Sequence, residues 1–410
     1  MKEPIIPYGK QFITDEDIAA VSNILRGDFL TQGPAILNFE RAFASYVGAR
    51  YAVAVANGTA ALHLCALAMD VKPGQKVITT PITFAASSNC IRYCGGEIVF
   101  GDIDPDTYLL DINHVRGLLE AAPENTYAGI IPVDFAGRGV NLEKFRALAD
   151  EFNLWIIEDS CHAPGGFFKD SNGGNQLCGN GTFADCAIFS FHPVKHIAAG
   201  EGGMITTNDE EKYQRLLRLR THGINRDASR FSNNLSIAFA SDSHPSEYPG
   251  WYMEMEELGY NYRLTDLQAA LALSQLQRAD EGLRRRREIA ATYQAAFCEV
   301  EGIIDRNLEA NHPSSNGHAH HLYVLEIPSF RNELYETLRS SMIFPQVHYI
   351  PTHLMPYYQK LGWKIGDLPF AENYYANCIS IPMFPTLTDK EQKKIIDVVI
   401  HFIKGKYEQK

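Results

Sequence analysis

The sequence has no long apolar run, no surplus of positive charge and no closely paired cysteines, although it extends over 410 residues. A helix that crosses a membrane needs about 20 predominantly apolar residues, and the longest apolar stretches here, such as 398–403, are far shorter. The 49 acidic side chains outnumber the 37 basic ones, for a net charge of −12. Proteins that bind nucleic acid usually present a basic face. We therefore expect neither a membrane nor nucleic acid among its partners.

The eight cysteines include no C-x-x-C pair, and residues 1–7 lack the charged and then apolar pattern of a signal peptide. Scattered thiols in a chain of this length are typical of a reducing compartment, so we expect a cytoplasmic protein. His318, His320 and His321 lie close together, but their spacing matches no zinc motif and no carboxylate lies among them. We expect no metal site.

From about residue 50 to residue 210, short β-rich runs alternate with amphipathic segments. This alternation is typical of an α/β sheet whose parallel strands are joined by helical crossovers. The predicted strands are 51–56, 77–80, 98–103, 129–133, 154–158, 186–189 and 204–207. The predicted helices between them include 59–69, 85–93 and 142–152. Polar residues follow several of these strands, at the edge where open α/β sheets bind ligands.

The chain becomes helical after residue 208 and changes character again after about 285. Predicted helices at 209–221 and 265–287 are separated by a polar stretch, 225–250, that we expect to be a long surface loop. Four consecutive arginines, 284–287, would end the second helix as a solvated face. The remaining predicted elements are strands at 321–327 and 347–350 and helices at 332–342 and 389–403. We expect a large domain over 1–285 and a smaller α+β domain over 286–410.

Two charged residues follow apolar strands and are candidates for chemistry. Lys195 lies between an apolar strand and a glycine-rich loop, and a partly desolvated lysine can form a Schiff base with a carbonyl group. Asp159 ends another apolar run, where a carboxylate needs a cation such as the protonated ring nitrogen of a cofactor. Each residue has an ordinary alternative, a surface lysine and an aspartate that caps the next helix.

Three further features complete the set that a pyridoxal-phosphate (PLP) enzyme needs. Gly58 and Thr59 form a turn from strand to helix, where free N–H groups and the helix dipole suit a phosphate. Ser190 ends a strand and offers a second phosphate donor, while Phe84 follows a proline turn and offers a face for stacking on a planar ring. An N-cap threonine and a core aromatic are the alternatives for Thr59 and Phe84. Neither G-x-G-x-x-G nor a Walker A motif is present.

Almost from end to end, the sequence resembles the DegT/DnrJ/EryC1/StrS family of sugar aminotransferases. The resemblance rests on the motifs LTQGP (30–34), ANGTAAL (56–62), TPITFAAS (80–87), EDSCHA (158–163), FSFHPVK (189–195), EGG (201–203), HG (222–223) and GYNYRLTDLQAA (259–270). It implies the cofactor pyridoxal 5′-phosphate. It also implies fold type I, the aspartate aminotransferase fold, with a large mixed-sheet α/β domain and a smaller C-terminal α+β domain. Within the family, FSFHPVK and QVHYIP (346–351) most resemble the transaminases of pseudaminic acid biosynthesis.

The resemblance also implies a role for individual residues. Lys195 would bind PLP through a Schiff base and then move the proton during transamination. Asp159 would pair with the ring nitrogen, and Phe84 would stack on the ring. The other implied cofactor contacts are Gly58, Thr59, Ala60, His162, Ser190 and Asn261, the last reaching the phosphate from the partner subunit of a homodimer. The implied substrate contacts are Arg263, His348 and Tyr349.

The implied reaction transfers the amino group of L-glutamate to C4 of a nucleotide-linked 4-keto-6-deoxy sugar and leaves 2-oxoglutarate. Family dehydratases have histidine in place of the lysine, so Lys195 favours transamination. Two alternatives stay open, another 3- or 4-keto nucleotide-sugar transaminase and a PLP-binding regulator without catalysis. The stretch 225–250 is longer than the family's usual connection, which leaves the sugar itself open.

Overall fold

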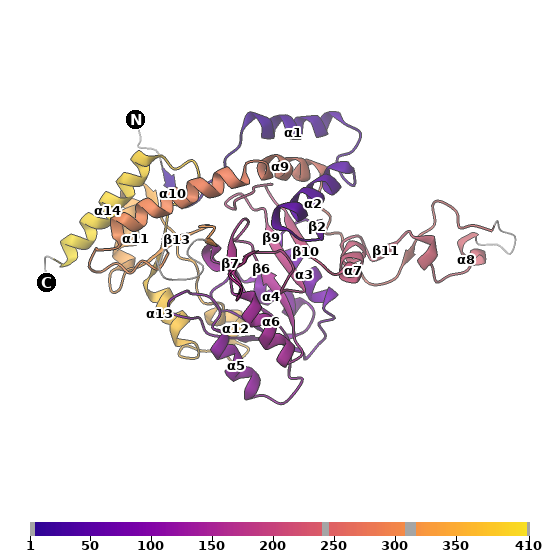
Figure 1. Ribbon diagram of the computed structural model, residues 1–410, viewed down its shortest axis with the longest axis horizontal. Helices are drawn as coiled ribbons and strands as arrows, with labels where there is room; N and C mark the ends of the chain where they lie inside the picture. The colour runs from indigo at the N-terminus through magenta and orange to yellow at the C-terminus, as the bar shows by residue number, and fades with distance from the viewer. Residues whose placement is uncertain (1–4, 240–245, 308–316, 408–410) are drawn as a thin grey trace.

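The computed structural model describes residues 5–239, 246–307 and 317–407, and a seven-stranded sheet lies at its centre (Figure 1). The strands are β2 (Tyr51–Val55), β3 (Lys76–Thr79), β4 (Glu97–Phe100), β5 (Tyr127–Ile131), β6 (Trp155–Asp159), β9 (Cys186–Ser190) and β10 (Gly203–Thr207). They lie in the order β2-β10-β9-β6-β5-β3-β4. β10 pairs antiparallel with both β2 and β9, and the other pairings in this sheet are parallel. The predicted mixed α/β sheet is confirmed.

Helices cover both faces of the sheet because successive residues of a strand point to opposite sides and both sides are buried. On one face, Ala54 of β2 belongs to the apolar cluster of α2 (Pro34–Val47) and α9 (Asp266–Leu276). On the other face, Val55 belongs to the cluster of α3 (Gly58–Ala68). That larger cluster also includes α4 (Ala86–Tyr93), α5 (Ile112–Glu120), α6 (Leu142–Glu151) and α7 (Glu210–Arg220). α1 (Asp15–Arg26) lies along α9 on the outside (Figure 1).

The C-terminal part has an apolar core of its own. The elements of this part are α10 (Ala279–Phe297), β13 (Tyr323–Glu326), α11 (Arg331–Ser340), β14 (Ile343–Phe344), α12 (Pro356–Gln359), α13 (Pro369–Asn377), β15 (Cys378–Ile381) and α14 (Asp389–Tyr407). α12 and α13 pack into the larger cluster of the sheet instead. β13 pairs with β15, and β14 pairs with β1 (Ile6–Pro7). The N-terminal segment therefore packs against the C-terminal part. The expected domain boundary at residue 285 falls inside α10 and stays a prediction.

Two predicted elements of this region are wrong. The helix predicted over 265–287 is divided, because α9 ends at Leu276 and α10 begins at Ala279. The strand predicted over 347–350 is not a strand. Gln346 still pairs with Ser380 as an isolated bridge. Beyond it, the carbonyl of His348 accepts a hydrogen bond from the Tyr374 hydroxyl and not from the backbone of a neighbouring strand.

The arginine run at 284–287 is also different from its prediction. It lies in the first half of α10 and not at the end of a helix. Arg286 is only 1% exposed, and its guanidinium donates to the carbonyl oxygens of His320, His321 and Met383. Its burial follows from helical spacing, since Arg286 shares the inward face of α10 with Leu283 and Ala290.

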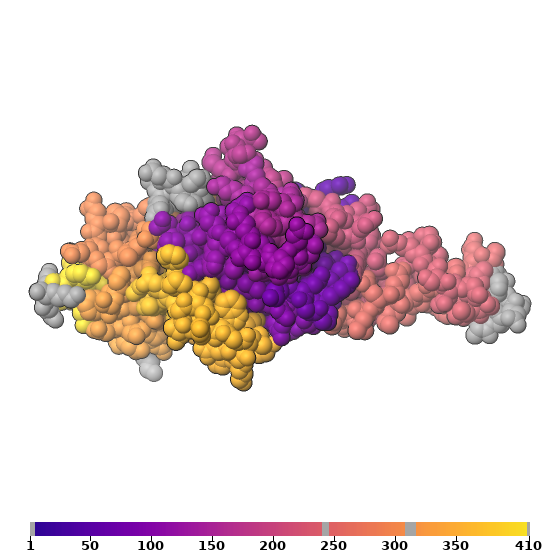
Figure 2. Space-filling view, turned by 90° about the horizontal axis from the view of Figure 1, so that it is seen from below, coloured from indigo at the N-terminus to yellow at the C-terminus, as the bar shows by residue number. Residues whose placement is uncertain are grey.

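The polar stretch predicted as a surface loop belongs to an arm, residues 224–258, that extends far from the body of the molecule (Figures 1 and 2). β11 (Ile224–Asn225) pairs with β12 (Glu254–Met255) at its base, and α8 (Leu235–Phe239) lies towards its tip. Residues 240–245 lie outside the described part. Among the described residues, no helix is long and apolar enough to cross a membrane.

Candidate active site

A cavity of about 540 Å³ lies where the carboxyl ends of β6 and β9 meet the start of α3. Most of the predicted site residues line it, namely Gly58, Thr59, Phe84, Asp159, His162, Ser190, Lys195, His348 and Tyr349. Residues from distant parts of the chain converge here because the parallel strands β6 and β9 end at the same edge of the sheet.

Lys195 lies in the loop that follows β9 and lines the cavity. Its backbone N–H donates to the carbonyl of His192 at 2.8 Å, which closes a turn before the lysine. Burial lowers the pKa of the Lys195 amine, and the nearby Cys161 and Asp159 oppose this shift. A lysine with a lowered pKa holds its amine in the neutral, nucleophilic form more often than a surface lysine does.

Asp159 is the last residue of β6 and is buried. One carboxylate oxygen accepts a hydrogen bond from Ser87 Oγ at 2.7 Å, and the other accepts one from the backbone N–H of Cys161 at 3.2 Å. These donors stabilise the ionised form and fix its orientation. The carboxylate lines the cavity and is therefore suited to a protonated ring nitrogen.

The turn before α3 has the geometry of a phosphate site. The side chain of Asn57 accepts a hydrogen bond from the backbone N–H of Ala60 at 2.8 Å and so caps the start of α3. The backbone N–H groups of Gly58 and Thr59 come just before Ala60 in the chain, and both residues line the cavity. A Cβ at residue 58 would lie 3.1 Å from Cβ of Ser190, tighter than ordinary packing. Glycine thus lets the backbone approach Ser190, and the two elements form a cradle for an anion.

Three neutral side chains, His162, Tyr349 and His348, line the cavity. His162 is hydrogen-bonded to Tyr349, whereas Nδ1 of His348 lies 2.9 Å from the hydroxyl of Ser380. Nδ1 of His162 accepts the backbone N–H of Ala136 at 3.2 Å, and Nε2 lies 3.2 Å from the hydroxyl of Tyr349. Because Nδ1 accepts, we assign the ring proton to Nε2. Burial lowers the pKa of His162 far below its usual value and raises that of Tyr349. Burial, together with the charge of Lys195, lowers the pKa of His348 to about 3.

Three predicted residues lie outside the cavity lining. Ala60 is buried in the first turn of α3 and its N–H is already bonded to Asn57. Asn261 is exposed and pairs with Thr221, and Arg263 pairs with Val55 at the edge of the sheet. The roles implied for these three residues stay predictions.

Sequence reasoning assigned no cofactor role to Tyr8, Ser87 or His321, which also line the cavity. Ser87 ends the TPITFAAS motif, so that motif contained its signal. Tyr8 reaches the site because the N-terminal segment pairs with β14, and nothing local in the sequence indicates that pairing. His321 comes from the histidine group and lies with its ring 4.3 Å from that of His162. His318 and His320 stack on each other instead, buried away from the cavity lining.

A lysine whose pKa burial lowers, a carboxylate suited to a ring nitrogen and a glycine turn suited to a phosphate meet at one edge of a mixed α/β sheet. Together they define a PLP-dependent enzyme of fold type I. Comparison with known proteins identifies the family. The chain belongs to the DegT/DnrJ/EryC1/StrS aminotransferase family, whose model matches residues 11–400.

The relatives agree with this assignment over nearly the whole chain. A spore coat polysaccharide biosynthesis protein of Bacillus subtilis, SpsC, is 38% identical over 98% of this chain and 97% of its own. A UDP-4-amino-4,6-dideoxy-N-acetyl-beta-L-altrosamine transaminase of Campylobacter jejuni is 33% identical over 97% of this chain and 98% of its own.

Solved structures give the same result. Helicobacter pylori PseC, described as an aminotransferase of pseudoaminic acid biosynthesis, matches with a TM-score of 0.83 at 28% identity, over 98% of this chain and 100% of its own. The PLP form of a sugar aminotransferase from Streptococcus pneumoniae, Spr1654, matches with a TM-score of 0.83 at 28% identity, over 98% and 99% of the two chains. The protein is thus a PLP-dependent sugar aminotransferase.

Proposed function

We propose that this enzyme moves the amino group of L-glutamate to C4 of a nucleotide-linked 4-keto-6-deoxy sugar. The sugar nucleotide we propose is UDP-2-acetamido-2,6-dideoxy-β-L-arabino-hexos-4-ulose, on a route to pseudaminic acid. The observation that carries the transamination is the meeting of Lys195, Asp159 and the turn at Gly58 in one cavity. The choice of sugar is supported by the altrosamine transaminase and by PseC, which are similar along the whole chain.

In the proposed reaction, each of these residues would have a separate role. Bound PLP would supply the electron sink for moving an amino group between two carbonyl partners. Asp159 would keep the ring nitrogen protonated, and Gly58, Thr59 and Ser190 would hold the phosphate. The Lys195 amine would take the proton from the α-carbon of glutamate and pass it on, because it is the lysine of the cavity lining and burial lowers its pKa.

The neutral side chains of His162, His348 and Tyr349 would bind the cofactor or the sugar without adding charge to the cavity. His162 would lie beside the phenolic side of the ring, with its orientation held by Ala136 and Tyr349. His348 and Tyr349 would donate or accept hydrogen bonds at the sugar hydroxyls, which matches their neutral state. Arg263 would bind the nucleotide part.

We further propose a homodimer in which the partner's Asn261 completes the phosphate site. Asn261 is exposed and lies outside its own chain's cavity, so it would reach a phosphate only in a second copy. It follows directly after the arm, whose described residues expose the apolar side chains of Trp251, Met255 and Leu258. Exposed apolar side chains of this kind mark a surface that a partner covers.

We propose the cytoplasm as the location of the reaction. All eight cysteines are free in the structure, which fits a reducing compartment.

The test of the main proposal is the visible spectrum of the purified holoenzyme. L-Glutamate should remove the yellow absorbance of the lysine-bound cofactor, and the correct keto sugar should restore it. A panel of UDP-, dTDP- and GDP-linked 3- and 4-keto sugars identifies the acceptor. Recovery with a different sugar only would overturn the pseudaminic assignment and leave the transaminase standing. A spectrum that does not respond to glutamate would favour the regulatory alternative.

A further inference from the structure

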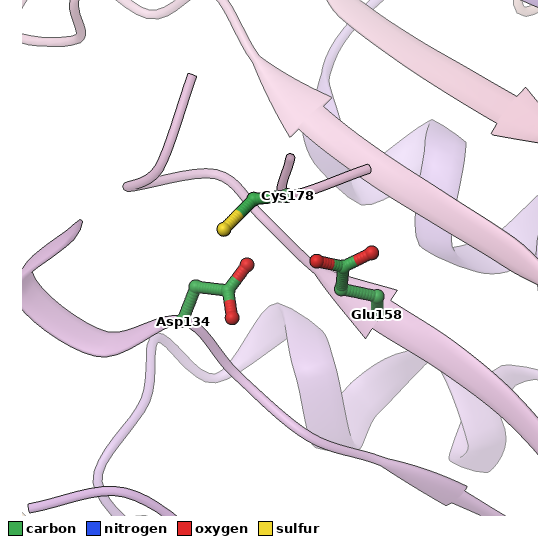
Figure 3. A group of neighbouring side chains, drawn as sticks. All are labelled: Asp134, Glu158 and Cys178. Atoms are coloured by element: carbon green, nitrogen blue, oxygen red, sulfur yellow. The ribbon is translucent and has the colours of Figure 1, made fainter. Parts of the chain in front are cut away.

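A pair of buried carboxylates, Asp134 and Glu158, lies beside Cys178 (Figure 3), and Glu158 directly precedes Asp159 of the cofactor cavity. Asp134 follows β5, Glu158 precedes Asp159 in β6, and Cys178 lies beside both, after β8 (Asn175–Leu177). Their exposed fractions are 0%, 1% and 1%, and their ligand atoms all lie within 4.8 Å of one another. Two ionised carboxylates this close in a buried site would repel each other strongly.

The hydrogen-bond donors are distributed unequally between the two carboxylates. Asp134 accepts from the backbone N–H of Val140 at 2.8 Å and from Ser160 Oγ at 2.6 Å, one donor for each oxygen. Among the described residues, Glu158 accepts a single backbone N–H, that of Gly179, shared between its two oxygens at 3.1 and 3.0 Å. Two separate donors stabilise a charge better than one shared donor. The geometry therefore locates the negative charge on Asp134 and the proton on Glu158.

The pKa shifts of the two carboxylates agree with a charge on Asp134 and a proton on Glu158. Burial raises the pKa of Asp134 to about 6, and burial with the nearby charge of Asp134 raises that of Glu158 well above its usual value. Burial also raises the pKa of the Cys178 thiol, which stays protonated. A bound metal ion would need these three groups deprotonated. A single proton shared between the two carboxylates instead removes their repulsion and needs no metal ion.

The charged member of the pair is connected to two residues of the cofactor site. The Asp134 side chain holds Ser160, which lies between Asp159 and the segment leading to His162. The Asp134 backbone N–H donates to the carbonyl of Asp159 at 3.0 Å. The loop that the Asp134 side chain closes at Val140 also contains Ala136, whose N–H orients His162.

We propose that Asp134 and Glu158 share one proton, with the charge on Asp134, and that this pair positions Asp159 and His162 against the cofactor. Neither carboxylate lines the cavity, so both are positioning residues and not catalytic ones. The inference depends on the cofactor and is independent of the sugar.

Two isosteric substitutions should behave oppositely. Glu158→Gln keeps a neutral side chain that accepts from Gly179 and donates to Asp134, so the dissociation constant for PLP should stay within about threefold of wild type. Asp134→Asn puts an amide where Ser160 and Val140 both need an acceptor, so PLP affinity should fall by about tenfold or more. Of these two substitutions, Asp134→Asn should shift the absorbance maximum of bound PLP and Glu158→Gln should not, because Asp159 and His162 would contact the ring.

The measurements are PLP titration by absorbance, the spectrum of the holoenzyme, and its metal content as purified. Ser160→Ala leaves both carboxylates in place and removes one donor, so it should reproduce the spectral shift with a smaller loss of affinity. The Ser160→Ala variant therefore still tests the proposal if Asp134→Asn fails to fold. Equal damage from Glu158→Gln and Asp134→Asn, an unchanged spectrum in Asp134→Asn and Ser160→Ala, or one equivalent of bound metal would each overturn the proposal. None of these readouts uses a sugar, so they do not test the proposed substrate.

Discussion

In the cofactor cavity, the functional side chains come from the ends of β6 and β9, which are bonded to neighbouring strands inside one sheet. The arm, by contrast, is joined to the body through β11 and β12, which are two residues each. The cavity buries its polar groups among hydrogen-bond partners, while the arm exposes apolar side chains at 57% for Ile237 and 69% for Trp251. The cavity lining comes from one chain, whereas the arm exposes an apolar surface of the kind that a partner covers.

The largest effect should come from Lys195, since the proposed reaction uses its amine in both halves. Lys195→Ala should lower turnover by at least about a thousandfold, because the covalent attachment and the proton carrier are lost together. The absorbance of lysine-bound PLP should disappear as well. The matched control is Lys72→Ala, on the exposed surface between α3 and β3, which should leave both readouts unchanged. Turnover retained by Lys195→Ala would mean that the chemistry lies elsewhere.

Asp159→Asn should have the next largest effect. The amide no longer keeps the ring nitrogen protonated, so turnover should fall by about a hundredfold while PLP stays bound through Lys195 and the phosphate turn. Ser87→Ala is the graded comparison, because it removes only one donor to the carboxylate and should cost about tenfold or less. If Ser87→Ala were the more damaging of the two, Asp159 would not be the partner of the ring nitrogen.

Much of this cavity could be predicted from the sequence because its residues follow strands with clear local signals. Asp159 ends an apolar strand, and Gly58 and Lys195 lie in the segments that follow two others, and the sheet topology brings such ends to one edge. The missed features depend on contacts between distant segments. Tyr8 reaches the cavity through a pairing with residues more than 330 positions later, and the burial of Arg286 depends on carbonyl groups of residues 320, 321 and 383.

The arm shows a second limit of sequence reasoning. Its polar composition predicted a surface loop, yet its described residues include a short ribbon and the mutually packed rings of Phe231, Tyr248 and Tyr252. Composition measures average polarity, whereas these few aromatic contacts arise from residues about 20 positions apart. The carboxylate pair of Asp134 and Glu158 was missed for the same reason, since neither position has a local signal of a buried partner.

Acid should act on the body of the molecule, where the buried histidines lie. Burial, with the charges of nearby arginines, lowers the pKa of His320 from its ordinary value of 6.5 to about 3. Between these values the unfolded chain binds a proton that the folded chain does not, so stability present above pH 6.5 is lost as the pH falls. At pH 5 this residue alone should cost about 2 kcal/mol of unfolding free energy.

The slope of unfolding free energy against pH checks this prediction. His320→Asn should flatten the slope between pH 6.5 and 5, whatever its effect on stability at pH 7. His401→Asn, at an exposed position on α14, should leave the slope as it is. The described residues of the arm contain no histidine, so hydrogen exchange in acid should rise behind the cavity before it rises in the arm. If hydrogen exchange in acid rose first in the arm, the two regions would not differ in acid stability as we expect.

The smallest effect should come from the arm, and it should appear in assembly before it appears in chemistry. Leu258 on the arm is 76% exposed and Ile365 on the body is 75% exposed, which makes them a matched pair. If the arm contacts a second copy, Leu258→Ser should raise the dimer dissociation constant by about tenfold, since one buried leucine contributes roughly 1.5 kcal/mol or more. Ile365→Ser should leave dimerisation unchanged in analytical ultracentrifugation. PLP affinity should then fall only at protein concentrations where the Leu258→Ser dimer dissociates, because the phosphate site would lose Asn261 of the partner subunit. Equal effects of the two substitutions would mean that the arm's apolar surface is not the dimer contact, and the contrast with the self-contained cavity would have to be explained by another partner.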